Sequence, residues 1–538
     1  MSTRKINNRW EWLLPVGALL LLAAILRLFS LSREPLLNAD GIAYILQAKA
    51  FYLQQAEQLL ETYPYPTNLA PMIAGLFHFT GDWIFSAQLI SIFFSLLTII
   101  PFYFLNRIFW SRRTATMVVF LYVVSPVFTE LAHEVIRGPQ FWFFLVLGLW
   151  GICDFLEREK PPAYLLILVA GAFIMAAWSR IEGLIPLFIT AVWLVSDSRS
   201  RKIRYLSAYF LPCGLILLVA AGLMISHNQA QFAPLGILFH GVNDRLLASV
   251  NRFQWLRDGL VDLRRNPPPG TGPGFFAESR TLLWFLAVGA TANSLRKTFG
   301  VIFFLITLFG LLRIRADKSG TNQQRRAKLF LKLLLLGGIF FIYIQILLNW
   351  SSSERFIAQI YFPALVFAGY GFERLFIYGQ KIKPDLSRTR AALLGCLVLL
   401  LCSLFPIVER SNLSRAVVFK DIGQMLATRH PAGQEIKLCG TSDKILFTHF
   451  YANLNRPTVA SPRKYCDIIR VDELKLSMLG DGQYDYLLLS DRDGGRRHFL
   501  SMMEQRADAG IVVVTERMTE KFGKVALFSL RSKSRSEP

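Results

Sequence analysis

Residues 13–26, LLPVGALLLLAAIL, form an apolar stretch without a single charge, and this stretch decides the fold class. With its flanking residues it is long enough to cross the hydrocarbon core of a bilayer, which takes about 20 residues of helix. The preceding MSTRKINNRWEW is basic, as in a secretory signal, but no small-residue cleavage motif follows. We therefore expect an uncleaved first transmembrane helix.

Similar apolar segments recur along the chain, which has 538 residues, of which 53% are hydrophobic and only 18% are charged. This composition is typical of an integral membrane protein and predicts a mainly α, polytopic fold with about eleven transmembrane helices. The candidate spans are residues 12–31, 84–105, 114–129, 138–156, 163–179, 183–196, 203–226, 297–313, 328–349, 356–378 and 391–408.

The net charge of +22 comes mostly from short loops such as RIFWSRR, SDSRSRKIR and RIRADKSGTNQQRRAK. Positive loops mark the cytoplasmic side of a membrane protein, so this charge indicates topology rather than a nucleic acid partner. The N-terminus is then cytoplasmic, and an odd number of spans places the C-terminal region outside, in the periplasm or the extracellular space. A bacterial inner membrane fits this arrangement.

Three outer segments follow from this topology. The membrane domain, residues 1–408, contains a first outer loop at 32–83 with two surface helices, and a second at 227–296. The second includes NPPPGTGPG, whose proline and glycine content favours a lid-like loop. Residues 409–538 alternate helix-like and strand-like runs, which predicts a soluble extracytoplasmic α/β domain. Cys439 and Cys466 in this domain either pair or stay separate buried thiols.

The first outer loop begins with LLNADGIAYILQAKAFYLQQ, residues 36–55, which places Asp40 at a membrane edge. A helix is expected from Asp40 to about Glu61, with Tyr44, Gln47 and Phe51 on the face of Asp40. A carboxylate in such a place costs desolvation energy, which suggests a functional role. Alternatively, Asp40 is the N-cap of the helix, and the two roles are compatible.

The short outer loop ELAHEVIRGPQ, residues 130–140, gathers a second set of polar residues. Helical spacing would place Glu130, His133, Glu134 and Arg137 on one face. The simpler alternative is an ion pair between Glu134 and Arg137 that caps the ends of two spans.

Three arginines are expected on the outer side, where orientation rules predict few positive charges: Arg137, Arg180 and Arg355. A guanidinium can bind a phosphate through its planar fork, which suits an anionic lipid head group. The alternatives are snorkelling, or pairing with Glu182 and Glu354. The spacing of the histidines does not favour a zinc site.

In the order of these parts the chain resembles the polytopic glycosyltransferases of the GT-C fold. More narrowly, it is similar to the bacterial family 39 group, which includes protein O-mannosyltransferases and lipid A aminoarabinose transferases. The matching segments are NADGIAYILQAKAF, YPYPTNLAPMIAGLFHFTGDWIFSAQLISIFFSLL, ELAHEVIRGPQFWFF, RIEG and ERFIAQIYFPALVFAGYGFERL. Two departures are Gly41, where members often have a second acid, and Tyr63 and Tyr65, where the aminoarabinose transferases have a Glu-Lys pair.

The resemblance implies an inverting transfer of a sugar from a polyprenyl-phosphate donor, such as undecaprenyl phosphate sugar, to a glycan, lipid or protein acceptor. In this interpretation Asp40 is the base, and Glu134 orients the acceptor or holds a divalent cation. Arg137, Arg180 and Arg355 bind the donor phosphate. Tyr44, His133, Glu182 and Tyr65 are candidate substrate contacts. No metal ligand set and no resident cofactor is predicted.

Two other functions fit the many spans. A transporter or a flippase for a lipid-linked sugar would also use intramembrane arginines, but the chain shows no evident repeated halves. A structural membrane scaffold would account poorly for isolated outer arginines.

Overall fold

The structure is a computed structural model that describes most of the chain. The described residues are 12–33, 36–55, 67–196, 202–226, 233–313, 321–350, 354–382, 395–404, 417–431, 433–457, 466–471, 483–492, 494–504, 511–519 and 522–530. The chain divides into two compact units. Unit 1 comprises Met1–Ser30, Ser91–His133 and Arg137–Val408, and unit 2 comprises Leu31–Ile90, Glu134–Ile136 and Glu409–Pro538.

Unit 1 is built from helices around one continuous apolar core, in which Phe128, Trp142 and Phe155 are completely buried. A mainly α fold is therefore confirmed. The helices, two of which begin or end in unit 2, are α1 (Leu13–Arg33), α5 (Trp83–Leu97), α6 (Ile99–Phe109), α7 (Arg112–Val124), α8 (Pro126–His133), α9 (Gly138–Glu157), α10 (Tyr164–Ser179), α11 (Leu184–Ser196), α12 (Lys202–Ser226), α13 (Ala233–Arg265), α14 (Pro273–Phe299), α15 (Val301–Arg313), α16 (Asn322–Asn349), α17 (Ala358–Ile382) and one over Gly395–Leu404.

Several of these helices can cross a membrane. Among the described residues, four are long and apolar enough, namely Leu13–Arg33, Trp83–Phe109, Gly138–Glu157 and Asn322–Asn349, and two bent pairs raise the number to six. Shorter apolar helices lie at three further predicted spans, 163–179, 183–196 and 391–408. The chain is a multi-pass membrane protein by these criteria, whereas the number of about eleven spans stays a prediction.

One bent pair changes the geometry predicted for the short outer loop, residues 130–140. Helices α7 and α8 meet at 58°, next to Pro126, whose ring disfavours helical backbone at Ser125 and supplies no N–H. Helix α8 then ends at His133, the next four residues bend, and α9 starts at Gly138. The common helical face predicted for Glu130, His133, Glu134 and Arg137 is therefore wrong, because the helix ends within this set.

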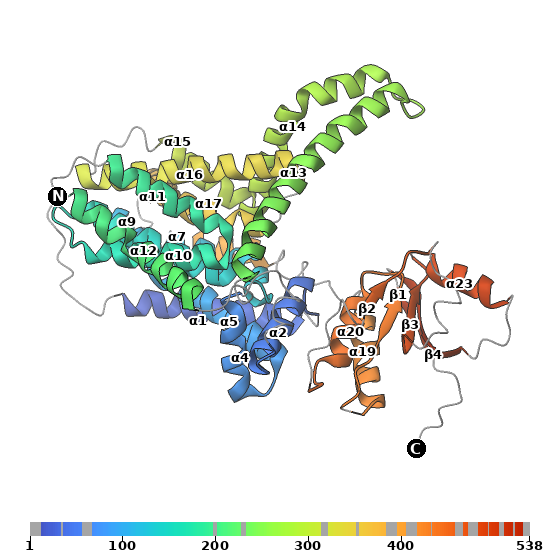
Figure 1. Cartoon of the computed structure of the whole chain (residues 1–538). Coiled ribbons are helices and arrows are strands. Elements are labelled where there is room, and N and C mark those ends of the chain that lie inside the picture. Colours follow the sequence, from blue (N-terminus) through green and yellow to red (C-terminus); the bar gives the residue numbers. More distant parts are fainter. Residues whose placement is uncertain are drawn as a thin grey trace. The chain divides into compact units, whose positions relative to one another are not determined.

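The second predicted outer segment is helical rather than a loop. Figure 1 shows α13 and α14 as a hairpin of two long helices, drawn in green. The proline and glycine run forms only the turn between them, where Gly270 has a left-handed φ of 84°. The lid-like loop expected over residues 227–296 is thus replaced by helix in most of its described part, because the run interrupts helix only locally.

The segment predicted as the first outer loop belongs to unit 2 and contains the helices α2 (Ala39–Tyr52) and α4 (Leu69–Thr80). Helix α4 ends at Gly81 with a left-handed φ of 68°, and α5 begins after Asp82, whose Oδ1 accepts from the backbone N–H of Ile84 at 2.8 Å. The ring of Phe77 stacks on Trp83 at 3.6 Å between centroids. The first helix was predicted to continue to about Glu61, and this is wrong, because α2 ends at Tyr52 and Gln54 has a left-handed φ of 57°.

The C-terminal part of unit 2 is a small α/β fold, as the alternating pattern predicts. Its sheet has the strand order β2-β1-β3-β5-β4, in which β1 pairs parallel with β2 and β3, whereas β5 pairs antiparallel with β3 and β4. Its elements are α19 (Val417–Arg429), β1 (Leu438–Gly440), α20 (Ile445–Asn453), β2 (Cys466–Ile468), β3 (Tyr486–Ser490), α23 (Gly495–Glu504), β4 (Val512–Thr519) and β5 (Gly523–Ser529). Cys439 and Cys466 are separate buried thiols, not a disulfide.

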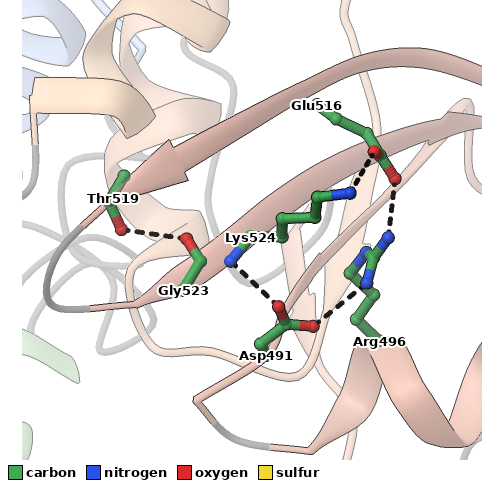
Figure 2. A network of polar contacts seen from close by, with 6 residues as sticks. All are labelled: Asp491, Arg496, Glu516, Thr519, Gly523 and Lys524. Atoms are coloured by element: carbon green, nitrogen blue, oxygen red, sulfur yellow. Dashed lines mark hydrogen bonds and ion pairs between the residues drawn. The ribbon is translucent and has the colours of Figure 1, made fainter.

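A network of charges ties the end of β3 to the β4–β5 hairpin (Figure 2). Asp491 accepts from the backbone N–H of Lys524 at 3.0 Å and from Nη1 of Arg496 at 3.2 Å. Nη2 of Arg496 donates to Glu516 at 3.0 Å, and this bond raises the pKa of Arg496. Gly523 has a φ of 65°, and a Cβ there would lie 2.9 Å from that of Asp491. The network therefore needs glycine at this turn.

The stability of this domain should depend on pH through His449. The side chain is fully buried in α20, neither ring nitrogen has a hydrogen-bond partner among the described residues, and burial lowers its pKa from 6.5 to about 4. Below pH 6.5 the unfolded chain binds more protons than the folded domain, so stability is complete above this pH and decreases as the pH falls towards 4. The total loss is about 3 kcal/mol.

Thermal unfolding of the full chain in detergent, followed from about pH 7 to about pH 4.5, checks this expectation. His449→Phe should remove most of the pH dependence of the C-terminal transition, and His498→Gln, at an exposed position of α23, is the matched control. Equal pH dependence in the unmodified protein and in His449→Phe would show that another group controls acid unfolding.

Candidate active site

The start of α2 positions the first predicted site residue. Asn38, not Asp40, is the N-cap: its side-chain oxygen accepts from the backbone N–H of Gly41 at 2.5 Å. The alternative of Asp40 as the cap is wrong, because the cap lies two residues earlier, at Asn38, and the helix starts at Ala39. Asp40 instead lies in the first turn, partly exposed, where a carboxylate interacts favourably with the helix dipole. The cap role therefore no longer explains this acid.

The same asparagine connects α2 to the second predicted carboxylate. Nδ2 of Asn38 donates to Oε2 of Glu134 at 3.2 Å, and Glu134 lies in the bend after α8. A Cβ at position 41 would lie 2.9 Å from the Cβ of Val135 and 2.9 Å from Oδ1 of Asn38. The departure from the family pattern at Gly41 thus has a steric reason, because the bend and the helix approach each other here too closely for a side chain.

The two functions of Asn38 can be separated by substitution. Asn38→Asp keeps a capping oxygen but replaces the donor to Glu134 with a second carboxylate, whereas Asn38→Ala loses both. We expect Asn38→Ala to destabilise unit 2 by about 1 kcal/mol through the cap. In Asn38→Asp two carboxylates face each other, and they can share a hydrogen bond only if one of them is protonated. Folding of this variant should therefore take up a proton, and its stability should increase as the pH falls. A flat pH response of Asn38→Asp relative to the unmodified protein, measured by thermal unfolding, would contradict this.

The other residues predicted on the face of Asp40 have different surroundings. Tyr44 is only 3% exposed and belongs to the apolar core of unit 2. Gln47 is fully buried and accepts from the hydroxyl of Thr67 at 2.6 Å, which connects α2 to the start of α4. Phe51 is half-exposed. Tyr65, a further candidate contact, lies outside the described residues.

The arginines belong to unit 1, and Arg180 forms the clearest ion pair there. Its Nη2 donates to Oε1 of Glu182 at 2.7 Å and its Nε to Oε2 at 3.3 Å, and both side chains are at most 10% exposed. Burial alone would raise the pKa of Glu182, but the charges of Arg180 and Arg137 outweigh it and hold the pKa below its usual value. Pairing with Glu182, one of the predicted alternatives, is therefore confirmed for Arg180.

The remaining arginines lie in the same part of unit 1. Arg137 is the N-terminal flanking residue of α9, and its charge acts on Glu182. Arg355 belongs to a short 3-10 turn, Glu354–Phe356, and the guanidinium of Arg180 lies 4.7 Å from the centre of the Phe356 ring. Glu182 and Phe356 thus link the neighbourhoods of all three arginines. His133 is buried, with Nδ1 3.4 Å from the carbonyl of Thr129.

Arg27 and Lys49 are buried cations that were not predicted. Arg27 of α1 is completely buried, its Nε donates to Ser95 at 2.8 Å, and its guanidinium lies 5.3 Å from the ring of Tyr122. Its position inside an apolar segment is a signal of a functional or structural polar network that sequence reasoning could have used. Lys49 of α2 is 3% exposed. Its signal is a lysine within the apolar run between Ile42 and Phe51.

A groove lies between α2 and α4, with a volume of 640 Å³. Its lining is mostly apolar: Ala50, Phe51, Tyr52, Gln54, Pro71, Ala74, Gly75 and His78. Such a surface suits an apolar chain better than a sugar. No group of three or more His, Cys, Asp or Glu side chains that could hold a metal ion occurs among the described residues.

Solved structures with a similar arrangement identify the fold. The crystal structure of ArnT from Cupriavidus metallidurans bound to undecaprenyl phosphate matches 99% of this chain and 100% of its own, with a TM-score of 0.58 at 12% sequence identity. ArnT is a GT-C glycosyltransferase. The chain has the GT-C fold.

Further comparisons agree with this fold. The apo state of the same ArnT matches 97% of this chain and 99% of its own, with a TM-score of 0.54 at 12% identity. The apo oligosaccharyltransferase of Archaeoglobus fulgidus matches 90% of this chain and 70% of its own, with a TM-score of 0.53 at 11% identity. No family model and no curated protein matches the chain. The predicted resemblance to GT-C enzymes is thus confirmed for the fold, and the narrower family 39 assignment stays a prediction.

Proposed function

We propose that the chain is an inverting membrane glycosyltransferase that moves a sugar from a polyprenyl-phosphate donor to a cell-envelope acceptor. The observation that carries this proposal is the match to the GT-C fold of ArnT over nearly the full length of both chains. The crystal structure of that ArnT is bound to undecaprenyl phosphate. The proposal also places the protein in a bacterial inner membrane, with a cytoplasmic N-terminus and the C-terminal domain outside. Family 39 is the group whose chemistry it follows.

The carboxylates supply the acid–base part of this mechanism. An acceptor hydroxyl or amine attacks the anomeric carbon, the bond from that carbon to the phosphate oxygen breaks, and its electron pair leaves with the lipid phosphate. The proton of the acceptor passes to Asp40, which later releases it to water. Asp40 lies in the first turn of α2, two residues after Asn38, whose side chain contacts Glu134, and this supports a shared site for both carboxylates. Glu134, hydrogen-bonded to Asn38, orients the acceptor or holds a divalent cation.

Arg137, Arg180 and Arg355 stabilise the charge that develops on the leaving phosphate. Their association through Glu182 and Phe356 supports a shared role. Because Glu182 is almost completely buried and bonded to Arg180, it orients this arginine rather than contacting the sugar. Tyr44 and His133 are almost completely buried, so we expect them to act through packing within their own units rather than by contacting the sugar. The hairpin of α13 and α14 is the candidate lid over the sugar.

The decisive experiment uses purified protein in vesicles that contain radiolabelled undecaprenyl-phosphate monosaccharides, one sugar at a time, together with envelope extracts as acceptor. A transferase releases undecaprenyl phosphate and moves the label to the acceptor. A flippase moves the labelled lipid across the bilayer with its sugar bond intact, and this result would replace the proposal. Mass analysis of the envelope glycans of a deletion strain then identifies the acceptor.

A further inference from the structure

Lys49 is a buried charge of unit 2 whose hydrogen-bond acceptors among the described residues are backbone carbonyls. Its ammonium donates to two backbone carbonyls at the C-terminal end of α20, that of Leu454 at 3.0 Å and that of Asn453 at 3.5 Å. The carbonyl end of a helix carries partial negative charge, so a cation there is favourable. Lys49 therefore connects the predicted active-site helix α2 to the C-terminal domain.

The receiving end of α20 is itself fixed to its domain. The side chain of Asn453 accepts from the backbone N–H of Ile436 at 2.9 Å and donates to the carbonyl of the same residue at 3.0 Å. Ile436 lies two residues before the start of β1 at Leu438. The contact of Lys49 thus transmits the position of the sheet to α2 through two short, buried connections.

A second contact lies at the other end of α2. The hydroxyl of Tyr451, also in α20, accepts from the backbone N–H of Leu37 at 3.4 Å, one residue before the cap Asn38. Phe450 and Tyr451 also pack into the apolar core formed by α2 and α4. The contacts at Leu37 and Lys49 are about three helical turns apart, so together they restrict both the shift and the tilt of α2.

The burial of Lys49 is not explained by stability. Burial is the main reason why its pKa falls to about 8; the carboxylate of Glu435 opposes this shift and the guanidinium of Arg456 adds to it. The charged form is therefore disfavoured in the folded state, and an apolar residue of similar length would avoid this cost. Lys49 thus keeps a disfavoured charge at a contact whose geometry fixes the place of α2, which suggests a function that depends on where this helix lies.

We propose that the C-terminal domain is a positioning device for Asp40, acting through Lys49 at one end of α2 and through Tyr451 at the other. The inference rests on the proposed role of Asp40 as the base. Lys49 and Tyr451 are positioning residues, since they act on the reaction only through the helix. Small displacements of a reacting group reduce rates strongly, by roughly 100-fold for about 1 Å.

The first experiment compares Lys49→Met, Lys49→Arg and the matched control Lys444→Met in the full-length protein. Lys444 is a lysine of the C-terminal domain, also in unit 2, that pairs with Asp443. We expect Lys49→Met to lower kcat by about 10- to 100-fold, with the KM for the lipid donor and the Tm nearly unchanged. Lys49→Arg, which keeps the charge and its donors, should recover part of kcat. Tyr451→Phe, which lacks only the hydroxyl, should lower kcat less because its hydrogen bond is long.

A second measurement does not require turnover. Hydrogen–deuterium exchange of the first turn of α2 should increase in Lys49→Met and stay unchanged in Lys444→Met, while the Kd for undecaprenyl phosphate stays the same in both. Unchanged exchange and unchanged kcat in Lys49→Met would overturn the positioning role. A fall in kcat accompanied by a proportional loss of folded protein would also overturn it, because Lys49 would then be only structural.

The two proposals fail in different ways. If Asp40→Asn is inactive but Lys49→Met is silent in both measurements, the positioning role is wrong and the proposed base stands. If Asp40→Asn is fully active, Asp40 is not the base. Faster exchange of α2 in Lys49→Met would then show that the contact positions the helix, but not for catalysis by Asp40, and full activity of Asp40→Asn therefore overturns the inference as stated.

Discussion

Replacing Asp40 with Asn should reduce sugar transfer from the polyprenyl-phosphate donor by about 100- to 10,000-fold, the range typical for loss of a general base. The amide has nearly the shape of the carboxylate but cannot take up the acceptor proton at neutral pH. Because Asn38 caps α2, the substitution removes no cap, and the fold should be retained. The Kd for undecaprenyl phosphate should stay unchanged, since the phosphate is assigned to the arginines.

Asp82→Asn is the matched control for this experiment. Asp82 is another acid of the same outer segment, and its Oδ1 caps α5 through the backbone N–H groups of Ile84 and Phe85. An asparagine keeps an oxygen at this position, so transfer should stay near that of the unmodified protein. If Asp40→Asn and Asp82→Asn were equally active, Asp40 would have no part in proton transfer and Glu134 would become the next candidate base.

The start of α2 shows how far the sequence could predict this site. Local spacing places the start of the helix within two residues of its observed position, because capping and apolar periodicity are local properties. The distinction between Asn38 and Asp40 as the cap depends on Glu134, which lies 96 residues away and accepts from Asn38. The same holds for position 41, where only glycine fits because Val135 lies too close for a side chain. Contacts of this kind depend on tertiary packing.

The membrane part shows a related limit. Apolar segments were located correctly at α1, α9 and α16, since composition alone determines them. The break at Pro126 was not predicted, and it decides which of the polar residues after α8 can share a face. Lys49 was overlooked for another reason: a single lysine in an amphipathic run is normally solvated, so its place in the apolar run is only a weak signal, and the backbone carbonyls that accept from it add none.

Removing Arg180 should have the largest effect on stability. Arg180→Met leaves Glu182 buried without its ion-pair partner, which costs about 3–5 kcal/mol for pairs of this kind. In the unmodified protein the lowered pKa of Glu182 means that this contribution is complete near neutral pH and is lost as the pH falls through that pKa. In Arg180→Met burial favours the protonated acid, so folding takes up a proton and stability should instead increase on acidification. Thermal unfolding of both proteins checks this: the stability of Arg180→Met should increase between about pH 7 and about pH 4.5, whereas the contribution of Glu182 in the unmodified protein is constant there and decreases only below about pH 4.5.

The double variant Arg180→Met/Glu182→Met separates the structural part of this pair from its proposed part in the reaction. With both charges gone, most of the lost stability should return, because apolar side chains of similar size can fill the site of a buried ion pair. Transfer activity should not return if Arg180 contacts the donor phosphate, since Arg137 and Arg355 would then face it alone. A stable double variant that transfers sugar like the unmodified protein would show that Arg180 serves only to neutralise Glu182, and the phosphate contact would be left to the other two arginines.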